Sequence, residues 1–281
     1  MEASNEELVH QAKGGDKNAL ETLVRRIQNQ IYNLAVRMLY DPADAEDAAQ
    51  EILIRIITRL SGFREESTFT TWAYRVAANY LLTTRRRKAE STLMSFDESE
   101  ALITRNSANV WRESESEAQQ GLVVAEIMIS CLQGLLLCLD REHRLAYILG
   151  EIFDVSGDQG AEILEIKPAA FRKRLSRART RLRSFMSKNC ALINPTNPCK
   201  CDNQADRQIE IGFLDTQNFA FATHPCRVKQ DQNLQSRLQE LDELNRVSTL
   251  FKSYIDVEAP DVFVENIRGI LTSGQYDIFE I

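Results

Sequence analysis

The sequence is poor in the residues and motifs that enzymes use for catalysis. Its 281 residues include only three histidines. It contains neither a glycine-rich loop that could cradle a phosphate nor a nucleophile elbow. We therefore expect a protein that has no catalytic residues, is not an enzyme and requires no cofactor.

Long apolar runs are also missing. The first residues, MEASNEELVHQAK, are acidic and lack the apolar core of a signal peptide. The longest apolar run, around Cys131 to Leu139, is shorter than the roughly 20 residues that cross a bilayer. These absences predict a cytoplasmic protein without membrane insertion. Its six cysteines should then be thiols or metal ligands rather than structural disulfides.

Basic charge is concentrated in one short stretch of an acidic chain. The formal net charge is -7 at pH 7, yet residues 172–183 carry seven basic and no acidic side chains. Apolar residues recur there at three- and four-residue spacing: Phe171, Leu175, Ala178, Leu182 and Phe185. This pattern predicts a helix with one apolar face and basic side chains elsewhere, which suits a phosphate backbone. A solvated basic surface helix is the alternative.

A short helix and a break precede this basic helix. The short helix is marked by four apolar residues: Ala161, Ile163, Leu164 and Ile166. Lys167–Pro168 interrupts it, because the residue before a proline avoids the α region and proline suits the first turn of a helix. This arrangement is typical of a helix-turn-helix, whose second helix enters the major groove with its N-terminus first.

The helix-turn-helix geometry divides the basic residues into two groups. Those nearest the helix N-terminus should lie closest to the base edges: Lys167, Ala169, Arg172 and Lys173. Those further along should contact phosphates, which position the protein without specifying sequence: Arg177, Arg179, Arg181 and Arg183.

The first ninety residues are predicted to be helical, with breaks between the helices. Ser4 and Glu7 fit a capping box, Asp16 and Asp41 suit N-cap positions, and Pro42 suits a first helical position. The helix after Pro42 carries an acidic face beside its apolar stripe: Asp44, Glu46, Asp47, Gln50 and Glu51. That face is either a docking surface for a basic partner or a complement to the helix dipole.

Residues 61–68 break the helical pattern, and a further helix is predicted from Phe69 to Lys88. It begins with aromatic residues and ends in a basic cluster: Arg85, Arg86, Arg87 and Lys88. Aromatic rings beside basic charge can stack on unpaired bases, although most aromatic stripes are simply core. We expect Trp72 mainly to pack and the preceding loop to contact bases.

Composition divides the remaining chain. Residues 91–121 carry 2 basic and 6 acidic side chains without sustained periodicity, which predicts a flexible linker. Helical periodicity returns at Val123 and leads into the helix-turn-helix. The predicted fold is therefore mainly α: a helical domain over 1–90, the linker over 91–121, a second helical domain over 122–187, and a smaller C-terminal domain over 188–281.

Two of these blocks resemble one family in the same order. Residues 41–88 read DPADAEDAAQEILIRIITRLSGFREESTFTTWAYRVAANYLLTTRRRK, which resembles region 2 of sigma-70-type RNA polymerase sigma factors of the extracytoplasmic-function (ECF) group. Residues 139–183 read LDREHRLAYILGEIFDVSGDQGAEILEIKPAAFRKRLSRARTRLR, which resembles region 4 of the same group. The resemblance covers roughly residues 5–187, about two thirds of the chain.

The resemblance implies a role for each surface. The acidic face of residues 44–51 would dock on core RNA polymerase. The loop of residues 61–68 and the start of the next helix would capture a flipped base of the minus-ten element. The implied contact residues there are Phe63, Arg64, Thr71, Trp72 and Arg75. The helix ending at residues 85–88 would lie along the minus-ten duplex, and the basic helix would read the minus-thirty-five element.

The resemblance further implies that the chain directs promoter recognition, DNA melting and transcription initiation. Its partners would be core polymerase, promoter DNA and an anti-sigma factor. Two alternatives remain: a stand-alone helix-turn-helix regulator, and a regulator that sequesters polymerase or a sigma factor. The acidic face and the loop of residues 61–68 have no role in a stand-alone regulator.

Two positions depart from the family pattern. Family members usually carry an apolar residue where Gly160 stands and a glycine where Glu165 stands at the turn. Glycine tolerates the positive φ of such a turn, whereas glutamate does so only at a cost. Glycine within a helix also costs about 1 kcal/mol relative to alanine. These departures predict a helix-turn-helix that is looser or differently turned than usual.

The C-terminal extension, residues 188–281, lies outside the resemblance. It carries 9 basic and 14 acidic side chains, a strand-like stretch from Ile209 to Phe221, and two helical stripes. Five potential metal ligands fall within 37 residues: Cys190, Cys199, Cys201, His224 and Cys226. They could hold one tetrahedral zinc, act as a redox switch, or be inert buried thiols. Being acidic, the extension could cover the basic helix and regulate it.

Overall fold

The chain forms helices that begin where their capping residues predict. The computed structural model describes residues 3–84, 95–103, 116–210, 214–223, 238, 240–253, 258–260 and 262–272. Helix α1 (Asn5–Lys13) starts after the capping box of Ser4 and Glu7. Asp16 accepts hydrogen bonds at the start of α2 (Lys17–Leu39), and Asp41 does so at the start of α3 (Pro42–Thr58). The predicted helix starts in this part are confirmed.

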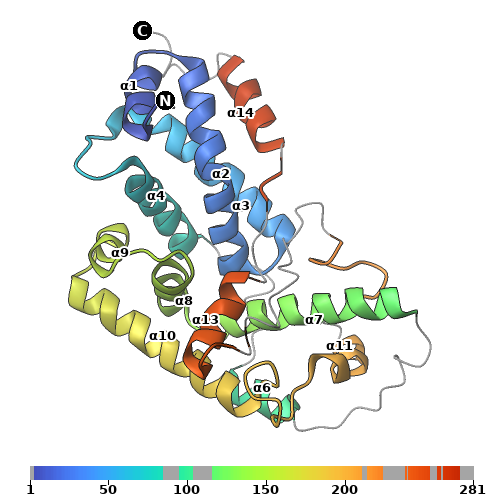
Figure 1. Ribbon diagram of the computed structural model, residues 1–281. Helices are drawn as coiled ribbons and strands as arrows, with labels where there is room; N and C mark the ends of the chain where they lie inside the picture. Colours follow the sequence, from blue (N-terminus) through green and yellow to red (C-terminus); the bar gives the residue numbers. More distant parts are fainter. Residues whose placement is uncertain are drawn as a thin grey trace.

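Helix α2 is the centre of the N-terminal part. It lies against α1, α3 and α4 (Phe69–Thr83), and its apolar side chains are almost completely buried along its length (Figure 1). A short 3-10 turn, η1 (Leu60–Gly62), opens the connection from α3 to α4, and Thr68 caps α4. The break predicted over residues 61–68 is confirmed. The predicted end of this helix at Lys88 falls outside the described residues.

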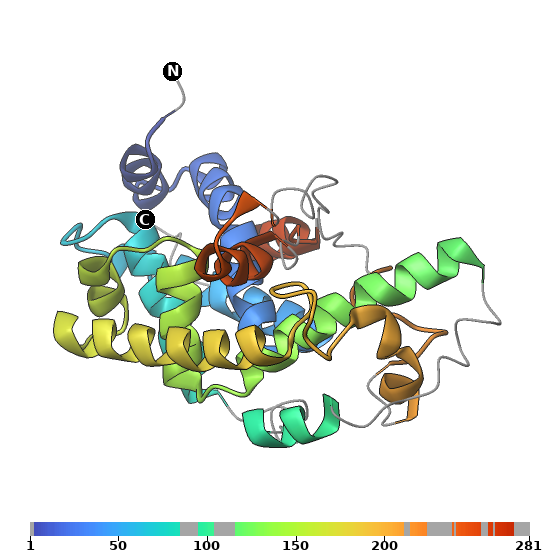
Figure 2. The same ribbon diagram turned by 60° about the horizontal axis from the view of Figure 1, so that its bottom comes forward.

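Part of the predicted linker is helical. Helix α6 (Phe96–Ile103) lies at the bottom of the view in Figure 2. Its first residue packs on the basic helix α10 (Pro168–Asn189). The rings of Phe96 and Phe185 are 5.5 Å apart, and Lys188 forms an ion pair with Glu100. An expectation of flexibility throughout residues 91–121 is therefore wrong for residues 96–103. Residues 85–94 and 104–115 are not described.

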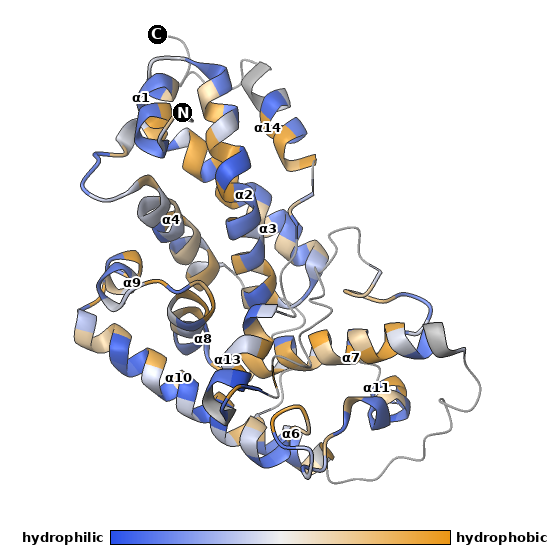
Figure 3. Cartoon of the chain, viewed as in Figure 1, coloured by the Kyte–Doolittle hydropathy of each residue, from blue (hydrophilic) through white to orange (hydrophobic). Residues whose placement is uncertain are grey.

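Helix α7 (Glu117–Leu137) is longer than the apolar run that marked it in the sequence. By length and composition its Gln119–Leu137 segment could cross a membrane, with a mean hydropathy of 1.7. Yet 67% of that segment is buried inside the protein. The orange bands of Figure 3 show how apolar this helix is. The apolar run around Cys131 to Leu139 is only the last part of this helix, and the burial of the helix is that of a core helix.

The predicted helix-turn-helix is present. It follows α8 (Arg141–Tyr147) and a π-helical turn, η3 (Ile148–Ile152), and consists of α9 (Gly157–Ile163) and α10. Lys167 occupies the N-cap of α10 and Pro168 its first position, as predicted. Glu165 adopts a φ of 51° at the turn, the conformation that usually favours glycine.

Gly160 has a packing role that the sequence did not indicate. An added Cβ would lie only 2.2 Å from the Phe171 ring, closer than real atoms approach. Phe171 is fully buried, so its ring cannot move away easily. Gly160 therefore lets α9 and α10 pack closely, and the predicted looseness of this motif has no support in its packing.

The C-terminal extension folds as helices and irregular segments. Its described elements are η4 (Cys201–Asn203), α11 (Ala205–Glu210), α13 (Glu243–Ser253) and α14 (Val262–Thr272). The strand-like stretch predicted from Ile209 to Phe221 is wrong where it is described, because Ile209 lies in α11 and residues 214–221 form no strand. The two predicted helical stripes correspond to α13 and α14.

A buried carboxylate anchors the extension to α7. Glu126 accepts hydrogen bonds from the backbone N–H groups of Ala220, Phe221 and Ala222, at 3.0, 2.9 and 2.6 Å. Its side chain is almost completely buried. A buried charge is tolerable when several donors solvate it, so Glu126 fixes the path of residues 220–222.

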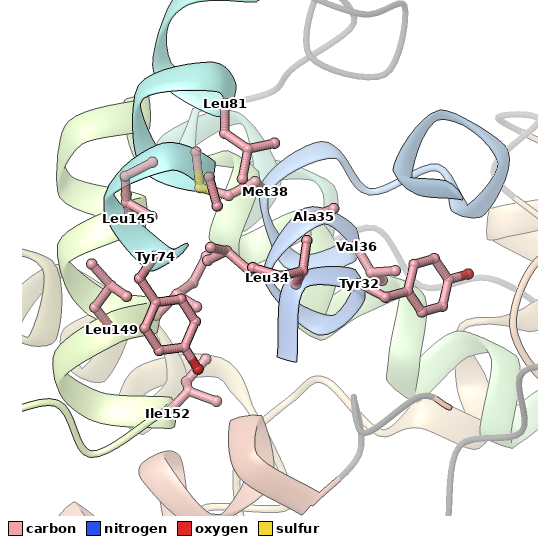
Figure 4. Packing of buried hydrophobic residues seen from close by; sticks show 14 of the residues in the cluster. Tyr32, Leu34, Ala35, Val36, Met38, Tyr74, Leu81, Leu145, Leu149 and Ile152 are labelled. Atoms are coloured by element: carbon pink, nitrogen blue, oxygen red, sulfur yellow. The ribbon is translucent and has the colours of Figure 1, made fainter. Parts of the chain in front are cut away.

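The two main helical parts share one hydrophobic core. Figure 4 shows the junction, where side chains from α2, α4, α8 and η3 meet: Leu34, Met38, Tyr74, Leu81, Leu145, Leu149 and Ile152. Arg144 of α8 is buried at the same junction. Its guanidinium donates to the carbonyl of Met38 at the end of α2 and to those of Leu136 and Leu139 near the end of α7. A cation suits the carbonyl-rich C-termini of helices, so Arg144 joins them.

Candidate nucleic-acid interface

The basic face of α10 is open to solvent. All the residues predicted to contact DNA on this helix are exposed: Lys167, Ala169, Arg172, Lys173, Arg177, Arg179 and Arg181. The opposite face holds the helix in place through Phe171, Leu175, Ala178 and Leu182, which are buried. The buried residues of α10 are those of the predicted apolar stripe. The packed stripe fixes the helix, and its basic side chains face the solvent.

Acidic side chains of neighbouring elements engage part of this face. Arg172 Nη1 lies 3.8 Å from Asp158 Oδ1. Arg179 forms an ion pair with Glu151. Arg174, which was not among the predicted contacts, is paired with Glu142 at 2.7 Å. Exposed pairs of this kind stabilise little, so a phosphate can displace them.

The start of α4 is more buried than its predicted role suggests. Phe63 is only 2% exposed and packs against Phe69 and Trp72, with ring centroids 6.2 and 5.3 Å apart. Thr71 is 5% exposed and its hydroxyl pairs with that of Thr68, which caps the helix. In this conformation Phe63 and Thr71 shape the loop rather than contact a base. Trp72 is half-buried and packs on the same rings.

The remaining predicted residues of this region are differently placed. Arg64 is exposed at the loop. Arg75 is half-buried, and its Nη2 donates to Glu162 Oε1 of α9 at 2.8 Å. Arg75 therefore contacts the helix-turn-helix in this structure. Four predicted residues lie outside the described part of the chain: Arg85, Arg86, Arg87 and Lys88.

The predicted acidic face lies on α3 as expected from its spacing. Asp47 is exposed, while Asp44, Glu46, Gln50 and Glu51 are half-buried. The Glu51 carboxylate accepts from Arg55 Nε at 2.8 Å, one turn further along the helix. The opposite side of α3 is buried through Ala45, Ala48, Ala49 and Ile52. The face is thus presented rigidly to solvent and could dock a basic partner.

The described cysteines of the predicted metal set lie near a fourth thiol. The backbones of Cys190 and Cys199 pair as an isolated parallel β-bridge, and both thiols are free. The Ala191 N–H donates to the Cys199 carbonyl at 3.0 Å. Burial raises the pKa of Cys131 in α7, and the neighbouring thiols of Cys199, Cys190 and Cys201 raise it further. Cys131 was missed in the sequence because it stands 59 residues before Cys190. Only folding brings the four together.

This thiol cluster is not arranged as a metal site in the part of the chain that is described. Over those residues, no group of three or more His, Cys, Asp or Glu side chains is placed to hold a metal ion. The other two predicted ligands, His224 and Cys226, lie outside the described residues. Burial raises the pKa of Cys199 to about 12 and also raises that of Cys190. Thiols with raised pKa values carry little thiolate, which disfavours a redox switch in this conformation.

Comparisons with known proteins match the two helical parts separately. A family model described as Sigma-70 region 2 matches residues 23–91, and one described as Sigma-70, region 4 matches residues 129–182. The first match contains the acidic face of α3 and the helix α4. The second contains the helix-turn-helix and most of α10.

Curated relatives cover the same part of the chain. The RNA polymerase sigma-H factor of Pseudomonas aeruginosa is 28% identical over 184 residues, which is 62% of this chain and 90% of that protein. The ECF RNA polymerase sigma factor SigW of Bacillus subtilis is 29% identical over 184 residues, 65% of this chain and 97% of that protein. The ECF RNA polymerase sigma-E factor of Escherichia coli is 29% identical over 177 residues, 61% and 88% of the two chains.

Solved structures also match, among them the sigma factor RpoE in complex with the anti-sigma factor NepR from Bartonella quintana. The TM-score is 0.41 and the identity 18%, over 59% of this chain and 95% of that one. The two sigma-70 region models match in order, one on the part that carries the acidic face and one on the part that carries the basic face. Together with the named relatives, they show that this chain belongs to the extracytoplasmic-function group of the sigma-70 family.

Proposed function

We propose that this chain acts in the cytoplasm as a sigma factor. It binds core RNA polymerase through the acidic face of α3 and directs promoter recognition, DNA melting and transcription initiation. The observation that carries this proposal is that one chain has a partly exposed acidic face on its region 2 part and an exposed basic face on its region 4 part. A polymerase subunit would bind the acidic face, and promoter DNA would bind the basic face.

The basic face of α10 supports duplex recognition upstream. Lys167, Ala169, Arg172 and Lys173 stand at the exposed N-terminal end of a helix-turn-helix recognition helix. In such motifs this end reaches base edges, while arginines further along neutralise phosphates. Together they fit the minus-thirty-five element.

The loop between α3 and α4 supports melting. Its aromatic trio fixes the loop in place, and the exposed Arg64 projects from it. A rigid loop beside basic charge is suited to hold a base that has left the stack.

An anti-sigma factor is a third proposed partner, and co-purification from cells would test for it.

The experiment that tests the proposal compares promoter binding with and without core polymerase. We expect specific binding of promoter DNA only when core is present, because the chain offers one recognition helix and relies on core for the rest. Tight, specific binding of duplex DNA by the chain alone would instead identify a stand-alone regulator. Binding to core that blocks transcription would identify a sequestering regulator.

A further inference from the structure

The C-terminal extension reaches both promoter-binding parts of the molecule. Figure 1 shows α13 lying against α10 and α8, and α14 lying alongside α2 at the other end of the molecule. The two helices are joined through residues 254–261, of which 258–260 are described. One short segment thus contacts the region 2 part (residues 1–90) and the region 4 part (residues 122–187).

Helix α13 is packed firmly on the region 4 part. Its Leu250 and Phe251 are fully buried, and the Phe251 ring meets the Tyr147 ring edge-on at 5.4 Å. Lys252 Nζ donates to both carboxylate oxygens of Asp154, at 2.6 and 2.8 Å. Burial of two large apolar side chains makes this a packed interface, and the ion pair closes its edge.

Helix α14 is packed on the region 2 part in the same way. Phe263 is 1% exposed and meets the Tyr32 ring edge-on at 5.7 Å. Arg268 donates from Nη2 and Nε to the two carboxylate oxygens of Glu21, at 2.7 and 3.0 Å. Just before the helix, the Ala259 N–H donates to Asn29 Oδ1 at 2.8 Å. These contacts repeat the pattern of α13: one buried aromatic ring and one ion pair.

The two parts that the extension bridges are closed on one another. Arg75 of α4 is paired with Glu162 of α9, and the Tyr74 ring lies 5.8 Å from that of Phe153. The helices that would bind the two promoter elements are therefore in contact. Elements named minus ten and minus thirty-five are about 25 base pairs apart, roughly 85 Å at 3.4 Å per base pair. This closed arrangement cannot engage both at once.

We propose that α13 and α14 form a built-in clasp that holds the two promoter-binding parts closed and so inhibits the protein until the clasp is released. The inference rests on the proposed sigma function. The clasp acts by bridging rather than by covering DNA-contact residues, because the basic face of α10 stays exposed beneath it. Whatever lifts α14 from α2 shifts the population toward an open form.

The test releases α14 in the full-length chain. Phe263→Glu places a charge against the apolar surface that includes Tyr32. Phe263 lies in the extension, so the substitution leaves the proposed polymerase-binding and DNA-binding residues unchanged. We expect transcription with limiting core polymerase to rise about tenfold, within the range usual for coupling between sites. Fluorescent labels at the exposed Asn18 and Ser184, introduced without using thiols, should move apart in the free protein.

Two further variants make the result decisive. Val262→Glu adds the same charge one residue earlier, where the side chain is 44% exposed, and should leave both readouts unchanged. Arg268→Glu faces Glu21 with a second carboxylate and should open the clasp even if Phe263→Glu folds poorly. Unchanged or reduced transcription and an unchanged label distance in folded variants would overturn the clasp. If neither the parent chain nor the folded, released variants support transcription, the sigma function itself fails, and the label distance still tests the clasp.

Discussion

Two single residues, Gly160 and Glu165, explain how the helix-turn-helix packs and turns although both depart from the family pattern. Gly160 departs from the family pattern because Phe171 occupies the space that a larger side chain would fill. Glu165 keeps the turn despite a φ of 51°. A strained residue persists when the surrounding packing determines its conformation. At this scale, therefore, the unusual residues of the motif are explained by its own core.

Replacing Gly160 by alanine should destabilise the protein, although alanine favours helices. The new Cβ would lie 2.2 Å from a fully buried ring, and overpacking of this kind costs about 1–3 kcal/mol. Gly134→Ala is the matched control, since nothing lies within 4 Å of its added Cβ in α7. It should stabilise by up to about 1 kcal/mol. Chemical denaturation of both variants measures the difference, and equal effects would refute the packing role.

Arg172 and Arg181 should separate base recognition from phosphate binding. Arg172→Ala should change the base preferred upstream, at a cost of about 1–3 kcal/mol for a bidentate base contact. Arg181→Ala should weaken binding to all sequences alike and lower the salt dependence. Selection of bound promoters from a random pool, with core present, distinguishes the two. An unaltered upstream motif for Arg172→Ala would mean that α10 does not read this groove.

Individual elements show where periodicity and capping predict structure well and where they do not. The starts of α1, α2, α3 and α10 follow from Ser4, Asp16, Asp41 and Pro168, because caps act locally. Helix α6 could not be predicted, since eight residues are too few to be stable alone. It forms where Phe96 packs on Phe185, a contact between residues 89 apart in sequence.

The acidic face of α3 should be required for docking on core polymerase. Reversing Asp47 and Glu51 to lysine places like charges against a basic partner, which should weaken core binding about 100-fold or more. Reversing Glu210 and Glu240, which are exposed in the extension, changes net charge equally and should have no effect. Co-purification with core measures both. If the Asp47 and Glu51 variant binds core normally, this face is not the docking surface.

Zinc in the extension stays a prediction. We expect about one zinc per chain in the reduced protein if His224 and Cys226 complete a shell with Cys190, Cys199 and Cys201. Cys199→Ser should lose the metal, whereas Cys138→Ser, outside this set, should retain it. Metal analysis provides the measurement. Absence of zinc, with all six thiols freely titratable in the native protein, would leave the cysteines without a metal role.

At the scale of the whole molecule, the sequence indicated the surfaces but not their arrangement. The basic face of α10 and the acidic face of α3 follow from helical spacing, so both could be found before folding. The burial of Phe63 and the pairing of Arg75 with Glu162 depend on contacts between distant segments. So do the junction at Arg144 and the bridging by α13 and α14. No local pattern encodes them.

The most direct test of the central claim is a run-off transcription assay with purified core polymerase. The template carries a promoter selected from a random pool by the chain bound to core. The account predicts transcripts of one defined length that require the chain, core and the selected promoter together. Templates with a scrambled minus-thirty-five element should lose the signal. Absence of promoter-dependent transcripts from both the parent chain and the Phe263→Glu variant, each folded and bound to core, would contradict the assignment of sigma function to this chain.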